Sequence, residues 1–220
     1  MKGGLLILLI LTCCVVAKND ITLKLLSVEV LKKINQQYSS DSVKRTKGWL
    51  AFLKKSELSS EWQKLHLVND FFNKNITYRS DLTLWKKNDY WATPIETLAQ
   101  GAGDCEDYAI AKYFSLLALG VAPVKLRLMY VRQLEINEPH MVLIYFSEPN
   151  TVPYVLDNYK TALLPANKRK DLKPIYSFNA QGLWLAKAKG LGVKINTKNK
   201  GFSHWNLMLN RIETLQVNRN

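Results

Sequence analysis

The stretch 101-GAGDCEDYAIAKYFSLLALG-120 joins a glycine-containing turn to a run with helical spacing, and a cysteine lies at the junction. Gly101 and Gly103 allow a tight turn, and Gly120 is typical of the residue that ends a helix. The first turn of a helix presents unpaired N–H groups and the positive end of the helix dipole, and both favour a thiolate over a thiol. We therefore expect Cys105 to be a reactive nucleophile.

A buried structural cysteine is the alternative interpretation, because a free cysteine packs as a small hydrophobic residue. Three acidic neighbours, Asp104, Glu106 and Asp107, argue against a core position. Carboxylates beside a thiol raise its pKa and oppose its activation, so they either point into solvent or bind a cation. Several hard carboxylate oxygens close together suit Ca²⁺. The spacing is not that of an EF-hand, and no His/Cys cluster indicates zinc.

A histidine and an aspartate follow the cysteine, His140 and Asp157, each in a strand-like segment. A cysteine followed by a separated histidine and aspartate is typical of a nucleophile triad. His66, in a predicted helix before the cysteine, and His204, beyond the strand-like segments, are the competing bases. We expect His140 to be the base and Asp157 to orient it.

The N-terminal segment resembles a secretory signal, with Lys2 ahead of an apolar run that is short for a membrane span. We expect residues 1–17 to be a signal peptide and 18–220 to form a single exported domain, periplasmic in a Gram-negative source. An uncleaved anchor and a lipoprotein at Cys13 or Cys14 are the alternatives. Cleavage would leave Cys105 as the one cysteine, so that no intramolecular disulfide could form.

The chain is strongly basic, with 31 Lys and Arg against 18 Asp and Glu in 220 residues and a formal net charge of +13. Such a surface favours acidic partners such as anionic proteins, lipid head groups or cell-surface polymers. Nucleic acid is a common partner of basic proteins, but export argues against it. We expect a monomer that binds no nucleic acid.

The pattern changes from helix in the front half to strand in the back half, which predicts an α+β domain. Helices are expected over 21–37, after a cap at Asp41, after a cap at Ser59 or Ser60, and after a capping box at Thr93. The Trp and Phe stripe of these helices, which includes Trp62, is expected in the core. Strands are expected over 124–132, 140–146, 152–157 and 174–179, with a hairpin near 191–203.

Five short motifs together carry a family resemblance: 91-WATPIETL-98, 103-GDCEDYA-109, 119-LGV-121, 140-HMVL-143 and 156-LDN-158. Over roughly residues 60–180, the chain resembles the transglutaminase-like cysteine proteases, and in particular their bacterial LapG-type branch. The resemblance implies a papain/transglutaminase-like fold, with the cysteine at the start of a central helix that packs on an antiparallel sheet. It implies catalytic roles for Cys105, His140 and Asp157.

The resemblance also implies a biological role. Proteases of this branch are calcium-dependent, lie in the periplasm and cleave large cell-surface adhesins, which controls attachment and biofilm release. An acidic pair that flanks the cysteine in the branch corresponds to Asp104 and Glu106, beside Asp107. An inner-membrane receptor that responds to cyclic di-GMP sequesters these proteases. The chain itself contains no recognisable receptor-binding motif.

Two other functions and one structural question stay open at this point. A transamidating enzyme would use the same triad with an amine in place of water, and a primary-amine probe separates the two activities. A non-catalytic binding module is disfavoured by the intact Cys105, His140 and Asp157. The oxyanion hole should combine the Cys105 N–H with a side-chain donor, for which Trp91 and Gln100 are the candidates.

Overall fold

Helices open the described part of the chain in this computed structural model, which describes residues 28–186, 192–195 and 200–217. The first three are α2 (Val28–Gln37), α3 (Ser40–Ser56) and α4 (Glu61–Asn75). The beginning of the helix expected at 21–37 and the expected signal peptide 1–17 lie outside the described residues. Among those described, no helix is long and apolar enough to cross a membrane.

Polar side chains cap the starts of α3 and α4. Ser60, one of the two expected caps of α4, forms a capping box with Gln63. The expected cap at Asp41 is wrong, because Ser39 adopts the extended cap conformation and its hydroxyl accepts the N–H of Ser42. Asp41 lies instead in the first turn of α3, where its negative charge still favours the helix N-terminus.

The segment before the cysteine folds as its sequence predicts. After β1 (Thr77–Tyr78) and the short α5 (Asp81–Trp85), Thr93 forms a capping box for α6 (Pro94–Gln100). Gly101 ends α6 with a left-handed φ of 67°, a conformation that favours glycine. The next residues form β2 (Ala102–Gly103), which pairs in parallel with β1. Helix α7 (Cys105–Ala118) then begins at the cysteine.

An antiparallel sheet forms the back half of the described chain, in the strand order β6-β5-β4-β3-β7-β8-β9. The expected strands are confirmed. Their bounds are β3 Leu126–Gln133, β4 Glu138–Tyr145, β5 Tyr154–Leu156, β6 Leu164–Pro165, β7 Leu172–Asn179, β8 Gly182–Leu185 and β9 Val193–Ile195. Short 3₁₀ turns at Pro123–Lys125 and Ala166–Lys168 precede β3 and β7.

The hairpin expected near 191–203 is wrong in its second half. Strand β9 pairs with β8, but the chain from Lys200 to Val217 forms helix α8. Trp205, Met208 and Ile212 recur at helical spacing and are buried, so this helix is held by its apolar face rather than by the basic stretch before it.

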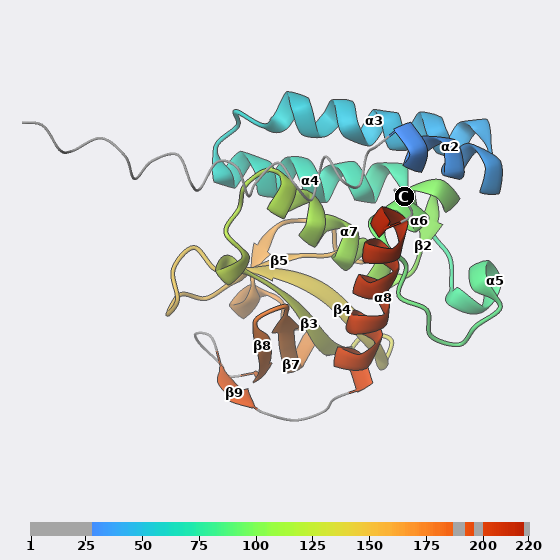
Figure 1. The fold of residues 1–220 in the computed structure, drawn as a ribbon. Helices are drawn as coiled ribbons and strands as arrows, with labels where there is room; N and C mark the ends of the chain where they lie inside the picture. The colour runs from blue at the N-terminus through green and yellow to red at the C-terminus, as the bar shows by residue number, and fades with distance from the viewer. Residues whose placement is uncertain (1–27, 187–191, 196–199, 218–220) are drawn as a thin grey trace, which may run out of the picture.

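The central helix α7 lies between the layer of α3 and α4 and the sheet (Figure 1). Buried residues of α7 such as Ile110 and Leu116 share one core with Leu128 and Leu143 of the sheet. Trp49 of α3 is also buried there and donates its indole N–H to Ser115 of α7 at 2.9 Å. The cysteine-bearing helix is therefore fixed from both sides, as expected for the predicted α+β fold.

The aromatic stripe of the front helices is only partly in the core. Trp49 and Phe72 are buried, as expected, but Trp62 is 45% exposed. Trp62 lies in the first turn of α4, where its ring packs edge-on against Tyr154 and His66 at the surface. The prediction for Trp62 fails because helical spacing does not show where a helix runs past the edge of the core.

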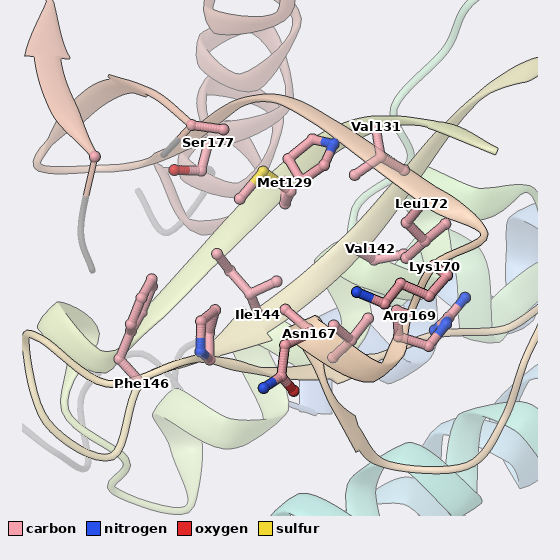
Figure 2. Close-up of a pocket in the computed structure, with 16 residues that line it drawn as sticks. Met129, Val131, Val142, Ile144, Phe146, Asn167, Arg169, Lys170, Leu172 and Ser177 are labelled. Atoms are coloured by element: carbon pink, nitrogen blue, oxygen red, sulfur yellow. The ribbon is translucent and has the colours of Figure 1, made fainter. Parts of the chain in front are cut away.

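The face of the sheet opposite α7 contains a second apolar cluster and a hollow of about 250 Å³. Alternate residues of a strand point to opposite faces, so Met129 and Val131 line this hollow while Leu128 packs under α7. Figure 2 shows Asn167 and Lys170 on the other side of the hollow. Cys105, His140 and Asp157 do not line it, so this pocket is separate from the predicted catalytic residues.

Candidate active site

Cys105 is the first residue of α7 and is half-buried. The backbone N–H of Met141, the residue that follows His140 in β4, lowers the pKa of the Cys105 thiol. The same thiol donates to Oε2 of Glu106 at 3.0 Å. The fold therefore brings the predicted nucleophile to the strand that carries the predicted base.

His140 and Asp157 form a buried pair. Nε2 of His140 lies 2.8 Å from Oδ1 of Asp157, and the two side chains are 9% and 0% exposed. The antiparallel pairing of Leu143 with Leu156 aligns the ends of β4 and β5 and so places the two residues together. With Nε2 held by the carboxylate, Nδ1 is the ring nitrogen that can exchange a proton with a nucleophile.

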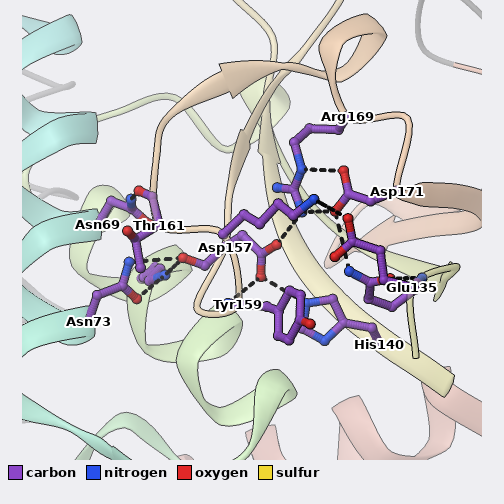
Figure 3. A network of polar contacts seen from close by, with 12 residues as sticks. Asn69, Asn73, Glu135, His140, Asp157, Tyr159, Thr161, Arg169 and Asp171 are labelled. Carbon is purple, nitrogen blue, oxygen red and sulfur yellow. Dashed lines mark hydrogen bonds and ion pairs between the residues drawn. The ribbon is translucent and has the colours of Figure 1, made fainter. Parts of the chain in front are cut away.

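Arg169 extends this pair to a second carboxylate (Figure 3). Its Nη2 lies 2.6 Å from Oδ2 of Asp157, while Nε and Nη2 donate to Asp171 at 3.0 and 2.8 Å. The backbone N–H of Tyr159 donates to Oδ1 of Asp157 at 3.0 Å. Both carboxylate oxygens of Asp157 therefore have donors, which fixes the plane of the group that faces His140.

These contacts determine the charge of Asp157. Burial raises its pKa, but the hydrogen bond and charge of His140, the Tyr159 N–H and the Arg169 guanidinium outweigh burial and hold the pKa well below its usual range. Asp157 is therefore a carboxylate at neutral pH. A carboxylate in this position stabilises an imidazolium and fixes its orientation.

The competing histidines lie in helices α4 and α8, whereas His140 is the histidine that pairs with Asp157. His66 packs against Trp62 on the outside of α4, and His204 of α8 lies 3.7 Å from Asp89.

The two predicted oxyanion donors are also placed: Trp91 is buried with its ring stacked on Phe178, and Gln100 ends α6 half-buried. Which of these two assists the Cys105 N–H stays a prediction.

An acidic cluster lies beside the nucleophile and includes two residues that the sequence interpretation missed. Carboxylate oxygens of Asp81, Asp104 and Asp107 lie within 4.8 Å of one another, and those of Asp81, Asp89 and Glu106 form a second such group. Asp81 begins α5 and Asp89 lies in the segment after that helix, and no motif or spacing in the sequence links them to Cys105. Only the fold reveals their proximity.

The cluster offers the oxygen ligands that a hard cation requires. Oδ1 of Asp104 and Oδ1 of Asp81 are buried and have no hydrogen-bond partner among the described residues, and unpaired buried oxygens are costly. The predicted ligand Asp107 differs, because its two oxygens accept the N–H groups of Ala92 at 2.8 Å and Asp104 at 3.4 Å. Asp81 and Asp104 therefore fit Ca²⁺ best, with Glu106 close to Asp81 in the second group and Asp107 bracing the turn behind them.

Charge repulsion within the cluster acts on the nucleophile. Burial and then the negative charges of Glu106 and Asp107 raise the pKa of Asp104. Burial, followed by Glu106 and Asp104, also raises the pKa of the Cys105 thiol, while the Met141 N–H opposes that rise. The benefit of the helix N-terminus is thus outweighed until the carboxylates are neutralised.

Comparison with known families identifies this arrangement. The family model of the bacterial transglutaminase-like cysteine proteinases, BTLCP, matches residues 35–172. The chain belongs to this family. It is therefore a cysteine peptidase with a transglutaminase-like fold.

Solved structures agree with the family assignment. Legionella pneumophila LapG is 39% identical with a TM-score of 0.71, and the match covers 85% of this chain and 98% of LapG. Its calcium-bound structure is 38% identical, with a TM-score of 0.71 and coverage of 85% and 99%. Its EGTA-treated structure is 39% identical, with a TM-score of 0.72 and coverage of 85% and 98%. A comparison with curated proteins gives no match.

Proposed function

We propose that this protein is a calcium-dependent periplasmic endopeptidase that cleaves a large cell-surface adhesin and so controls attachment and biofilm release. The observation that carries the proposal is the buried His140–Asp157 pair on the strands against which the Cys105 helix packs. Similarity to LapG over most of both chains supports the same proposal. The basic charge of the chain favours an extended acidic segment as substrate.

Cys105, His140 and Asp157 divide the chemistry among them. His140 takes the thiol proton at Nδ1, and the Cys105 thiolate attacks the scissile carbonyl carbon to form a C–S bond. The imidazolium then protonates the leaving amine as the C–N bond breaks, and a water molecule hydrolyses the thioester to return the free thiol. Asp157 stabilises the imidazolium through Nε2, as the 2.8 Å contact allows.

Calcium would be held by Asp81, Asp104 and Glu106, with Asp89 and Asp107 in the same cluster. When bound, it supplies positive charge that offsets the carboxylates next to the thiol. The unpaired oxygens of Asp81 and Asp104 support this assignment. So do the calcium-bound and EGTA-treated structures of the similar LapG.

Export and regulation complete the proposal. Residues 1–17 direct the chain to the periplasm as a signal peptide, and an inner-membrane receptor that responds to cyclic di-GMP sequesters the protease there. Both elements rest on the resemblance and on the composition of the N-terminal segment. The mature protein acts as a monomer on a protein substrate and binds no nucleic acid.

Incubation with N-terminal fragments of the large adhesins encoded by the same organism tests the proposal. Wild-type protein should cleave such a fragment in the presence of calcium, whereas Cys105→Ala and His140→Ala should not. His66→Ala is the matched control and should cleave at the wild-type rate. Cleavage by Cys105→Ala would contradict the proposal, and incorporation of a fluorescent primary amine without cleavage would identify a transamidating enzyme instead.

A further inference from the structure

Lys112 is a buried cation on the same helix as Cys105. Its side chain has no exposed surface, and its ammonium donates to Oδ1 of Asn73 at 2.9 Å and to the backbone carbonyl of Asp157 at 3.0 Å. Asn73 of α4 donates its own amide to the same carbonyl at 2.9 Å. A closed set of three hydrogen bonds thus joins α7, α4 and the backbone of Asp157.

The free-energy cost of burying Lys112 indicates that this residue does more than stabilise the fold. Removing an ammonium group from water is unfavourable, and a well-packed apolar residue of similar size is often neutral or stabilising at such a site. Burial lowers the pKa of Lys112 to about 7, against the opposing effect of the Asp157 and Asp70 charges. Stability alone therefore does not account for a lysine here.

We propose that Lys112 is a positioning residue of the peptidase, which ties the backbone of Asp157 to the helix that carries Cys105. This inference rests on the proposed catalytic roles of Cys105, His140 and Asp157. It concerns a residue that contacts neither the substrate nor the reacting atoms.

The geometry explains how this contact acts at the active site. Cys105 and Lys112 are about two helical turns apart and lie on nearly the same face of α7. The helix therefore sets the distance between the nucleophile and the ammonium that holds the Asp157 carbonyl. Arg169 fixes the carboxylate of the same residue, so Asp157 is held at both its backbone and its side chain while it orients His140.

Lys112→Met tests the inference, because methionine fills the volume without charge or donors. Ser115→Ala is the matched control: it removes a buried polar contact with Trp49 one turn further along α7, away from Asp157. Three measurements are made on the full chain in calcium. They are the melting temperature, the rate of iodoacetamide alkylation of Cys105 read by mass spectrometry, and the NMR signal of the His140 Nε2 proton.

We expect Lys112→Met to melt no lower than wild type, yet to alkylate at least about tenfold more slowly at neutral pH, since small misplacements of catalytic groups are costly. The His140 Nε2 proton should exchange faster with water. Ser115→Ala should alkylate at the wild-type rate. If Lys112→Met does not fold, Asn73→Ala, which removes a partner of both the ammonium and the carbonyl, should show the same slow alkylation.

His140→Ala separates failure of this inference from failure of the catalytic assignment. If His140→Ala alkylates slowly while folded Lys112→Met, or Asn73→Ala in its place, keeps the wild-type rate and proton signal, the positioning role of Lys112 is overturned. If His140→Ala itself alkylates at the wild-type rate, the proposed role of His140 fails, and the inference falls with it.

Discussion

Replacing Arg169 with methionine tests the network behind the catalytic pair. The guanidinium makes three charge-assisted hydrogen bonds, one to Asp157 and two to Asp171. Arg169 and Asp157 have side chains that are 1% and 0% exposed. Without Arg169, the described partners of the Asp157 carboxylate are His140 and the Tyr159 N–H. The variant therefore leaves buried negative charge on Asp157 and Asp171 without the guanidinium that pairs with both carboxylates.

The expected effect on stability is large. Removing one partner of a buried ion pair costs about 3–5 kcal/mol, because the other charge stays buried and unpaired. For a chain of this size, each kcal/mol shifts the melting temperature by about 2–4 °C. Arg169→Met should therefore melt about 6–20 °C below wild type.

The pH dependence has a definite sign. Because the folded pKa of Asp157 lies below its unfolded value of about 4, this carboxylate contributes stability that is present above pH 4 and lost as the pH falls. The difference between wild type and Arg169→Met should thus be largest at neutral pH and should shrink below about pH 4.

Thermal melts followed by circular dichroism make the measurement, with Lys160→Met as the matched control. Lys160 also reaches this network, at 3.5 Å from Asp171, and pairs with Glu135 at 2.6 Å, but its side chain is 39% exposed, and exposed pairs contribute little. The reasoning is refuted if Arg169→Met melts no lower than Lys160→Met at neutral pH.

Three further changes have expected outcomes. Alanine at Gly103 would place a methyl group 2.7 Å from Cβ of Asp107, so it should lower the melting temperature and the alkylation rate of Cys105. Alanine at Gly48 should leave that rate unchanged, because its methyl group would meet no described atom within 4 Å beyond the backbone of its own helix; equal rates for the two variants would argue against a tight turn at Gly103. Calcium at a hundredfold excess over its Kd should stabilise wild type against unfolding by about 2.7 kcal/mol. Asp81→Asn should lose most of this stabilisation in calorimetry, and an undiminished stabilisation would remove Asp81 from the ligand set. The KM for an acidic adhesin segment should rise with salt, because exposed charges are screened over about 8 Å at physiological ionic strength, and a salt-independent KM would contradict the electrostatic contribution.

Local chemistry made much of the site predictable from sequence. The turn before Cys105, the capping boxes at Thr93 and Ser60 and the strands that carry or precede His140 and Asp157 all follow from neighbouring residues. Their signals lie within a few positions of each other, where backbone preferences and hydrogen bonds decide the outcome.

The remaining parts of the site depend on contacts between distant segments. Asp81 meets Asp104 only because β1 pairs with β2 and brings the start of α5 to the cysteine turn. Lys112 lies in a run of helical spacing, and its contact with Asp157 arises only because α7 packs beside that residue. No periodicity in the sequence encodes such contacts, since each depends on how whole elements pack.

Cleavage of an adhesin N-terminal fragment, followed in one sample with calcium, then with EGTA, then with calcium restored, tests the central claim most directly. The account predicts cleavage in calcium, loss of cleavage in EGTA and recovery when calcium returns, with no cleavage by Cys105→Ala in any condition. Cleavage at full rate in EGTA by metal-stripped protein, or cleavage by Cys105→Ala, would contradict it.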